Sequence, residues 1–187
     1  AIFSCSISFQ KREKGLNHQI KMPKIQGPEK LKSDLELRKD LQSKIPKDYL
    51  PMWLREREIE TRQVEPVDLL KAEKLPPYRS TWMKPTGKLP ADERIHQALL
   101  LYVSDMGLLG AAVNPHEVNF MSKKFQSASL DHVMWFHGKV NFNNWILHHM
   151  HSPISQNARG FSRGSIYTKS GKLIASTAQE GLMRIWD

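Results

Sequence analysis

Asp105 is the first residue whose position suggests chemistry. It lies in the last turn of a helix predicted to begin at residues 89–93, where the helix dipole disfavours an anion by about 0.3–1 kcal/mol. Leu101 and Ala98 precede it by one and two turns, which places Asp105 on or beside the apolar face. Its carboxylate is therefore either functional or reaches solvent beside Gly107, which is predicted to end the helix.

Gln179 and Ser129 are further candidates, and both lie in predicted strands. Within residues 172–185, Gln179 shares a face with apolar residues by alternation, where an unpaired amide would cost about 1–3 kcal/mol. Its amide therefore either has a functional partner or is satisfied by backbone groups in the core. Ser129 opens the predicted strand 129–137, a place where a serine alone indicates no function.

A cluster of histidines resembles a metal site in composition but not in geometry. In the predicted strand 145–151, His149 and His151 share one face, while His148 lies on the other. No carboxylate or cysteine nearby completes a ligand set. We therefore expect no bound metal.

A nucleophilic triad is a separate possibility. Ser129 could act with His132 or His137 and an aspartate, as in serine hydrolases. Ser129 lacks the Gly-x-Ser-x-Gly turn that exposes such a nucleophile. This weakens the triad hypothesis and leaves it open.

The segments that would position these residues predict an α+β fold. A helical stretch within residues 33–57 is interrupted by Pro46 and Pro51, and residues 59–64 are extended. After the helix that Gly107 ends, the pattern predicts only strands. The strands of the third region cover residues 79–83, 129–137, 145–151, 160–168 and 172–185, with a tight turn at 170–171. One helix with a run of antiparallel strands indicates a sheet wrapped around a helix.

The opening segment, residues 1–9, alternates large and small residues and is predicted to be a strand. Cys5, the only cysteine, is expected to be a small packed residue within it, so no intrachain disulfide forms and a reducing compartment fits. A chain that begins within a strand is expected to be part of something longer.

Composition restricts the class of protein. The 187 residues include 28 Lys and Arg against 19 Asp and Glu, a net charge of +9, and no apolar run is long enough to span a membrane. A basic surface attracts polyanions, including nucleic acid and phosphorylated cofactors. A nucleic-acid-binding module is disfavoured because the aromatic residues are not interleaved with Lys or Arg as a stacking platform requires. The aromatic residues meant here are those of residues 135–145, namely Trp135, Phe136, Phe142 and Trp145.

Four blocks of sequence resemble the C-terminal half of the type II acyl-CoA thioesterases, in the order found in that family. They are residues 96–105 (HQALLLYVSD), 129–137 (SLDHVMWFH), 158–164 (ARGFSRG) and 175–184 (ASTAQEGLMR). Residues 3–10 (FSCSISFQ) and 18–23 (HQIKMP) resemble the end of the family's first repeat and the linker after it. The resemblance thus covers most of the chain.

The resemblance implies a hotdog fold, an antiparallel sheet wrapped around a central helix. More specifically, it implies a double hotdog whose first repeat is incomplete in this chain. Residues 1–30 would be a remnant of the first hotdog and 31–75 a linker with a helical segment. Residues 76–187 would form the second, complete hotdog with the active site.

The resemblance also implies hydrolysis of fatty acyl-CoA to free fatty acid and CoA. By position, the family's active-site residues are Asp105, Ser129 and Gln179. Asp105 would direct the attack of water, while Ser129 and Gln179 would hold both the water and Asp105 in place by hydrogen bonds. Acyl-CoA is the expected partner, with no cofactor and no nucleic acid, and a homo-oligomer is expected.

Two further expectations concern the chain as a whole. The alternative to an active hydrolase is a catalytically silent relative that binds acyl-CoA or pairs with an intact subunit.

The chain ends at Trp186 and Asp187 without the Ser-Lys-Leu signal for peroxisomes. The peroxisomal matrix and the cytoplasm are both compatible with the family.

Overall fold

The computed structural model describes residues 2–68, 70–118 and 120–186. The helices are α1 (Asp34–Asp40), α2 (Leu50–Trp53), α3 (Glu93–Ser104) and α4 (Gly110–Val113). The strands are β1 (Ile59–Gln63), β2 (Tyr78–Pro85), β3 (Phe125–Ser129), β4 (Val133–Phe136), β5 (Ile146–Gln156), β6 (Arg159–Thr168) and β7 (Leu173–Ile185). Single 3-10 turns lie at Pro28–Lys30, Gln42–Lys44 and Lys47–Tyr49. This is the α+β arrangement that the sequence predicts.

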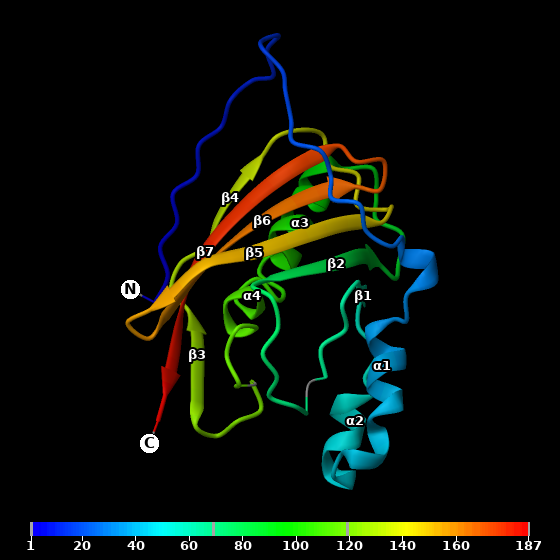
Figure 1. The fold of residues 1–187 in the computed structure, drawn as a ribbon. Helices are drawn as coiled ribbons and strands as arrows, with labels where there is room; N and C mark the ends of the chain where they lie inside the picture. Colours follow the sequence, from blue (N-terminus) through cyan, green and yellow to red (C-terminus); the bar gives the residue numbers. More distant parts are fainter. Residues whose placement is uncertain (1, 69, 119, 187) are drawn as a thin grey trace.

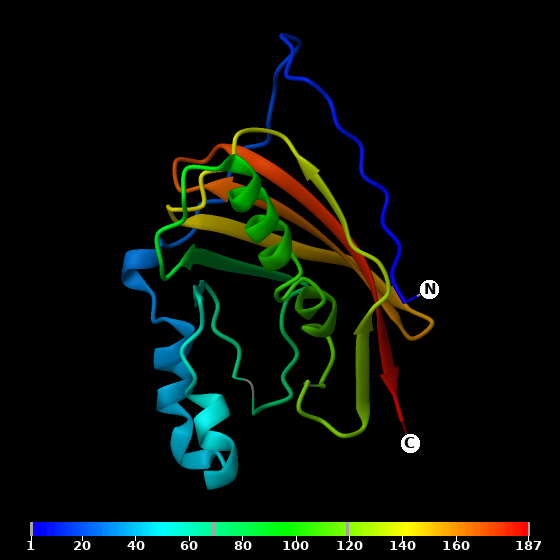
Figure 2. The same ribbon diagram turned by 180° about the vertical axis from the view of Figure 1, so that it is seen from behind.

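One antiparallel sheet contains these strands. Its order is β1-β2-β5-β6-β7-β3, and β4 pairs with β7 on the same side as β3. The sheet curves around α3, which lies against its concave face (Figures 1 and 2). The long central strands β5, β6 and β7 form the part of the sheet that α3 packs against (Figure 1). The predicted sheet wrapped around a helix is confirmed.

The main core lies between α3 and the concave face of the sheet. Leu100 and Val103 of α3 are fully buried against Met83, Ile146 and Ile166 of the sheet. Burial of such side chains stabilises the fold by about 1.5–3 kcal/mol each. The helix begins at its N-cap Asp92, whose carboxylate accepts the backbone N–H of Arg94, and Gly107 adopts a positive φ of 78° just beyond its end.

The helix is buried on one side only. Its fully buried positions include Leu100 and Val103, whereas Ile95, Leu101 and Tyr102 are 43%, 46% and 65% exposed. The broad apolar face predicted from the sequence is therefore only partly covered. The reason is geometric, since the sheet contacts one side of the helix and leaves the other side open (Figure 2).

The segment before α1 covers one end of the convex face of the sheet (Figure 1). Trp82, Leu147 and Tyr167 are buried there, and Met22 and Ile25 pack against them. The indole N–H of Trp82 donates to the carbonyl oxygen of Gln26 at 2.9 Å. This hydrogen bond fastens the segment to the sheet. The expected linker also contributes β1, which pairs with β2 along its whole length.

The predicted opening strand is wrong. Residues 2–9 join no strand of the described sheet, and Ile2, Phe3, Ile7 and Phe9 are largely exposed. Cys5 is exposed as well, not packed. An alternating pattern produces a strand only when a neighbouring strand supplies hydrogen bonds, and the blue N-terminal trace runs outside the sheet (Figure 1).

Two further predictions need correction after α3. The chain does not continue only as strands, because Gly110–Val113 forms the short helix α4, fully enclosed at Ala111 and Ala112. The predicted strand 129–137 is divided, so that Ser129 ends β3 instead of beginning a strand. The strands β2, β5, β6 and β7 agree with the sequence prediction, although β5 extends beyond it to Gln156.

No helix among the described residues combines the length and the apolar character needed to cross a membrane.

Candidate active site

Asp105, Ser129 and Gln179 meet in one hydrogen-bonded cluster, although they come from α3, β3 and β7. The hydroxyl of Ser129 donates to Oδ1 of Asp105 at 3.4 Å. The amide nitrogen of Gln179 donates to the same Oδ1 and to Oγ of Ser129, the latter at 3.1 Å. The structure thus brings together the three side chains that the resemblance assigned to the active site.

Asp105 is placed by the end of α3. It is the C-cap of that helix, and the positive φ of Gly107 turns the chain away just after it. Its side chain is 57% exposed, so the carboxylate reaches solvent and is hydrogen-bonded as well. Both hydrogen bonds go to Oδ1. Within the described ranges, Oδ2 accepts no hydrogen bond.

Gln179 is placed by alternation along β7. Its neighbours on the same face, Ala175, Thr177 and Gly181, are buried, and Gln179 itself is 1% exposed. The prediction that its amide needs a partner is confirmed for Nε2. The carbonyl oxygen Oε1 is buried and has no partner among the described residues.

Ser129 is placed by a break between β3 and β4. Leu130 donates its backbone N–H to the carbonyl oxygen of Glu180 at 2.9 Å. The carboxylate of Asp131 accepts the backbone N–H of Glu180 at 2.8 Å, in place of a ladder carbonyl. Such an irregularity redirects side chains. It presents both Ser129 and His132 to the residue before Glu180, which is Gln179.

His132 and Ser104 complete the cluster, and the sequence prediction missed their place in it. Nε2 of His132 lies 2.8 Å from Oγ of Ser104, and Nδ1 lies 3.5 Å from Nε2 of Gln179 and 4.0 Å from Oδ1 of Asp105. Burial lowers the pKa of His132, partly opposed by the charges of Asp105 and Asp131. In the unbroken strand predicted for residues 129–137, Ser129 and His132 would lie on opposite faces, so alternation gave no signal that they meet at one site.

The geometry disfavours the nucleophilic triad. Among the described residues, Ser129 hydrogen-bonds to Asp105 and Gln179 and to no histidine. His137 lies elsewhere, with Nε2 2.8 Å from Oγ of Ser176. No group of three or more His, Cys, Asp or Glu side chains in the described ranges is arranged to hold a metal ion.

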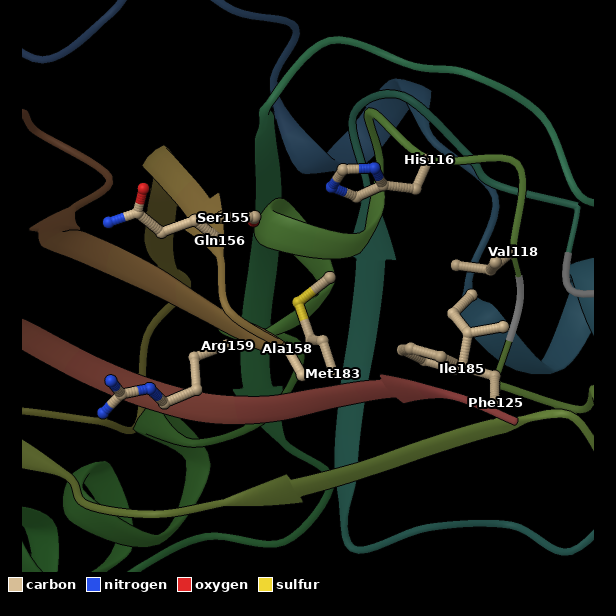
Figure 3. A pocket seen from close by; sticks show the side chains of 9 residues that line it. All are labelled: His116, Val118, Phe125, Ser155, Gln156, Ala158, Arg159, Met183 and Ile185. Atoms are coloured by element: carbon tan, nitrogen blue, oxygen red, sulfur yellow. The ribbon is translucent and has the colours of Figure 1, made fainter. Parts of the chain in front are cut away.

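A pocket of about 220 Å³ lies farther along the face of β7 that carries Gln179 (Figure 3). Met183, four residues beyond Gln179, and Ile185 line it together with Phe125 of β3. Between the cluster and the pocket, Leu109 packs over Gly181, where a β-carbon would lie 2.6 Å from its Cδ1. The inner face therefore runs from a polar cluster to a largely apolar pocket.

Solved structures with the same architecture define the class. The chain superposes on a hotdog-fold protein of unknown function from Alicyclobacillus acidocaldarius with a TM-score of 0.62, at 16% identity, covering 95% of this chain and 60% of that one. An acyl-CoA thioesterase II from Mycobacterium marinum gives a TM-score of 0.68 at 28% identity, with 95% and 61% coverage. The fold is the hotdog fold.

Sequence relationships then specify the family. The acyl-CoA thioesterase family model matches residues 53–182, and the chain belongs to this family. It is 36% identical over 177 residues to acyl-CoA thioesterase 2 of Haemophilus influenzae, covering 95% of this chain and 62% of the relative. It is 34% identical over 197 residues to acyl-coenzyme A thioesterase 8 of Mus musculus, covering 99% and 60%. The chain therefore spans about three fifths of the length of these relatives.

Proposed function

We propose that this protein hydrolyses fatty acyl-CoA to free fatty acid and CoA by an attack of water that Asp105 directs. The observation that carries the proposal is the anchoring of Oδ1 of Asp105 by Ser129 and Gln179, which leaves Oδ2 of this largely exposed carboxylate without a protein donor among the described residues. Membership of the acyl-CoA thioesterase family supports the same reaction.

In this mechanism Oδ2 of Asp105 accepts a proton from the attacking water, whose oxygen bonds to the thioester carbonyl carbon. The C–S bond then breaks, and the proton passes from Asp105 to the departing sulfur, which leaves as the CoA thiol. Ser129 and Gln179 fix the carboxylate and orient the water. A positioned base of this kind typically contributes 10²–10⁴-fold to the rate.

The surroundings of the cluster fit the two parts of the substrate. A net charge of +9 favours the anionic phosphates of CoA. For the acyl chain, we assign the apolar pocket around Met183, Ile185 and Phe125 (Figure 3). It lies on the same face of β7 as Gln179, beyond the Leu109 side chain that packs over Gly181, so an acyl chain that extends from the cluster along that face must displace or pass Leu109 to enter it.

The proposal extends to the organisation of the molecule. Residues 76–187 act as the second hotdog with the active site, residues 1–30 belong to a first repeat, and 31–75 connect them while adding β1 to the edge of the sheet. The relatives' greater length supports this division, and the exposed Ile95, Leu101 and Tyr102 of α3 favour contact with a second repeat or subunit. A relative from Saccharomyces cerevisiae is named a peroxisomal thioester hydrolase, so we propose a peroxisomal or cytoplasmic location.

The exposed side of α3 also favours a second candidate function. A catalytically silent chain could bind acyl-CoA or pair with an intact subunit through this surface. The silent form predicts binding of a non-hydrolysable acyl-CoA ether without turnover of the thioester. It also predicts a larger species by light scattering when an intact family member is added.

The experiment that tests hydrolysis measures thiol release from a series of acyl-CoA esters. Asp105→Asn should lower kcat by 10²–10⁴-fold while leaving the circular dichroism and the melting temperature unchanged, because the side chain is largely exposed. Asp48→Asn, an exposed aspartate far from the cluster, is the matched control and should retain full activity. Equal activity of Asp105→Asn and the unmodified chain would overturn the proposal.

A second experiment separates direct water attack from an acyl-enzyme. An acylated Ser129 would give a burst of CoA thiol on rapid mixing, followed by a slower steady state. Direct water attack gives no burst and no adduct on Ser129 by mass spectrometry. An adduct would replace this mechanism with the triad hypothesis.

A further inference from the structure

The hydrogen bonds around Ser104 determine which nitrogen of His132 carries the proton. Oγ of Ser104 lies 2.7 Å from the carbonyl oxygen of Leu101 and 2.8 Å from Nε2 of His132. A carbonyl oxygen can only accept, so the single hydroxyl hydrogen goes to Leu101. Ser104 must then accept from His132, and the neutral ring carries its hydrogen on Nε2.

This tautomer leaves a lone pair on Nδ1, the atom that faces Gln179. The amide nitrogen of Gln179 has two hydrogens and three acceptors around it, which are Oδ1 of Asp105, Oγ of Ser129 and Nδ1 of His132 at 3.5 Å. An amide turned by 180° would place its carbonyl oxygen against a carboxylate and a ring lone pair. The surrounding acceptors therefore favour one orientation of the amide.

We propose that His132 is a positioning residue, which accepts from the amide of Gln179 through Nδ1 and keeps the amide nitrogen turned toward Asp105. This rests on the proposed function in so far as it concerns catalysis. Ser104, fully buried at the end of α3, acts one step farther away by holding the tautomer. The chain Ser104–His132–Gln179 thus links the helix end to the amide on β7.

Protonation of His132 would reverse this arrangement. With hydrogens on both nitrogens, Nδ1 would confront the amide hydrogens of Gln179 and attract the carboxylate of Asp105, 4.0 Å away. The titratable groups around His132 are Asp105 at the end of α3, Asp131 from the β3–β4 break and His148 from β5. The two aspartates favour the charged ring and burial opposes it, whereas His148, whose pKa burial lowers to about 3, is uncharged above that pH.

The first test requires no activity. Long-range ¹H–¹⁵N correlation spectra of the histidine-labelled chain, with His132→Asn to assign the signal, should show a protonated Nε2 and an unprotonated Nδ1 above neutral pH. Ser104→Ala should shift the ring toward the Nδ1–H tautomer. A ring of the unmodified chain with its hydrogen on Nδ1 would overturn the proposal.

The second test compares two amide replacements. The oxygen of Asn can occupy the place of Nδ1, whereas the longer Gln reaches toward Nε2 and Ser104. His132→Asn should therefore retain kcat within about twofold, and His132→Gln should lose about tenfold in kcat at unchanged KM. His132→Asn should also lose the contribution of His132 to the acid limb of the kcat profile. The matched control is His137→Gln, outside the cluster, with no change.

The outcomes separate the positioning role from the function. Equal loss in His132→Asn and His132→Gln, with equal loss of melting temperature, would mean a merely structural role and overturn the proposal. Full activity of His132→Gln would also overturn it. If the unmodified chain hydrolyses no acyl-CoA, the proposed function fails, while the spectra still decide whether His132 orients Gln179.

Discussion

The carboxylate of Asp131 accepts a hydrogen bond of 2.8 Å from the backbone N–H of Glu180, a residue 49 positions farther along the chain. This contact occurs where β3 gives way to β4 beside β7. Because Glu180 follows Gln179 directly, the contact fixes the position of the β3–β4 break relative to the candidate active site. Ser129 and His132, on either side of Asp131, both reach Gln179 as a result.

Asp131→Ala should loosen this break. The lost charge-assisted hydrogen bond is solvent-exposed, so we expect the free energy of unfolding to fall by only about 1 kcal/mol in urea titrations. The effect on kcat should be larger than this loss suggests, about tenfold, because Ser129 and His132 shift together. Asp131→Asn keeps an acceptor oxygen, so its kcat and its free energy of unfolding should lie between those of Asp131→Ala and those of the unmodified chain. Unchanged kcat in Asp131→Ala would show that the break is held by other contacts.

The sequence predicted those parts of the fold that depend on local pattern. Alternation along β7 correctly placed Gln179 inside, and the glycine after α3 correctly ended the helix. The division of residues 129–137 was not predicted, because it depends on the contact between Asp131 and Glu180. An alternating pattern does not indicate where a side chain, here the carboxylate of Asp131, accepts a backbone N–H that a carbonyl of the neighbouring strand would otherwise accept.

The candidate site shows the same limit. Asp105, Ser129 and Gln179 were each noticed for local reasons, and only the family resemblance joined them. The pair of Ser104 and His132 was not predicted, because the two side chains are 28 positions apart in the sequence and are joined only by a hydrogen bond in the folded chain. Residues 2–9, the described part of the predicted opening strand, show the opposite error, since this strand-like segment pairs with no strand among the described residues.

Gly164 should be intolerant of a side chain. It lies on β6 between His148 of β5 and Thr177 of β7, and a β-carbon would come within 2.1 Å of Nε2 of His148 and 2.4 Å of Oγ1 of Thr177. Gly164→Ala should lower the free energy of unfolding by about 1–3 kcal/mol through overpacking. The control is Gly138→Ala, where the nearest atom would lie 3.5 Å away on the Lys172 side chain.

Urea titrations of both glycine variants give the comparison. Gly138→Ala should change the free energy of unfolding by no more than about 0.5 kcal/mol. A Gly164→Ala variant as stable as the unmodified chain would mean that the side chains of His148 and Thr177 can move aside to admit a methyl group. In that case the close approach at Gly164 is not a constraint on the sheet.

His148 should make the fold less stable in acid. It is fully buried, and burial lowers its pKa to about 3. The unfolded chain binds this proton near pH 6.5, whereas the folded chain binds it only near pH 3. Between these values the unfolded state holds more protons, so stability falls as the pH is lowered. The contribution has a slope of up to about 1.4 kcal/mol per pH unit.

The free energy of unfolding of His148→Gln, measured at several pH values, isolates this contribution. The glutamine can still hydrogen-bond Thr177 but has no proton to gain, so the slope between pH 6.5 and about 3 should be smaller than in the unmodified chain. His151→Gln, an exposed histidine of the same strand, should leave the slope unchanged. Identical slopes in all three proteins would show that His148 is protonated in the folded state.

Met183 should influence the preferred length of the acyl chain. It lines the pocket on the Gln179 face of β7, and Met183→Trp would fill part of that space (Figure 3). Each methylene excluded from an apolar site loses about 0.8 kcal/mol. Exclusion of two methylenes should lower kcat/KM for long acyl-CoA esters by about tenfold, with little change for short ones. Leu182→Trp, whose side chain lies on the opposite face of β7, is the control. A uniform loss across all chain lengths in Met183→Trp would mean that the acyl chain does not enter this pocket.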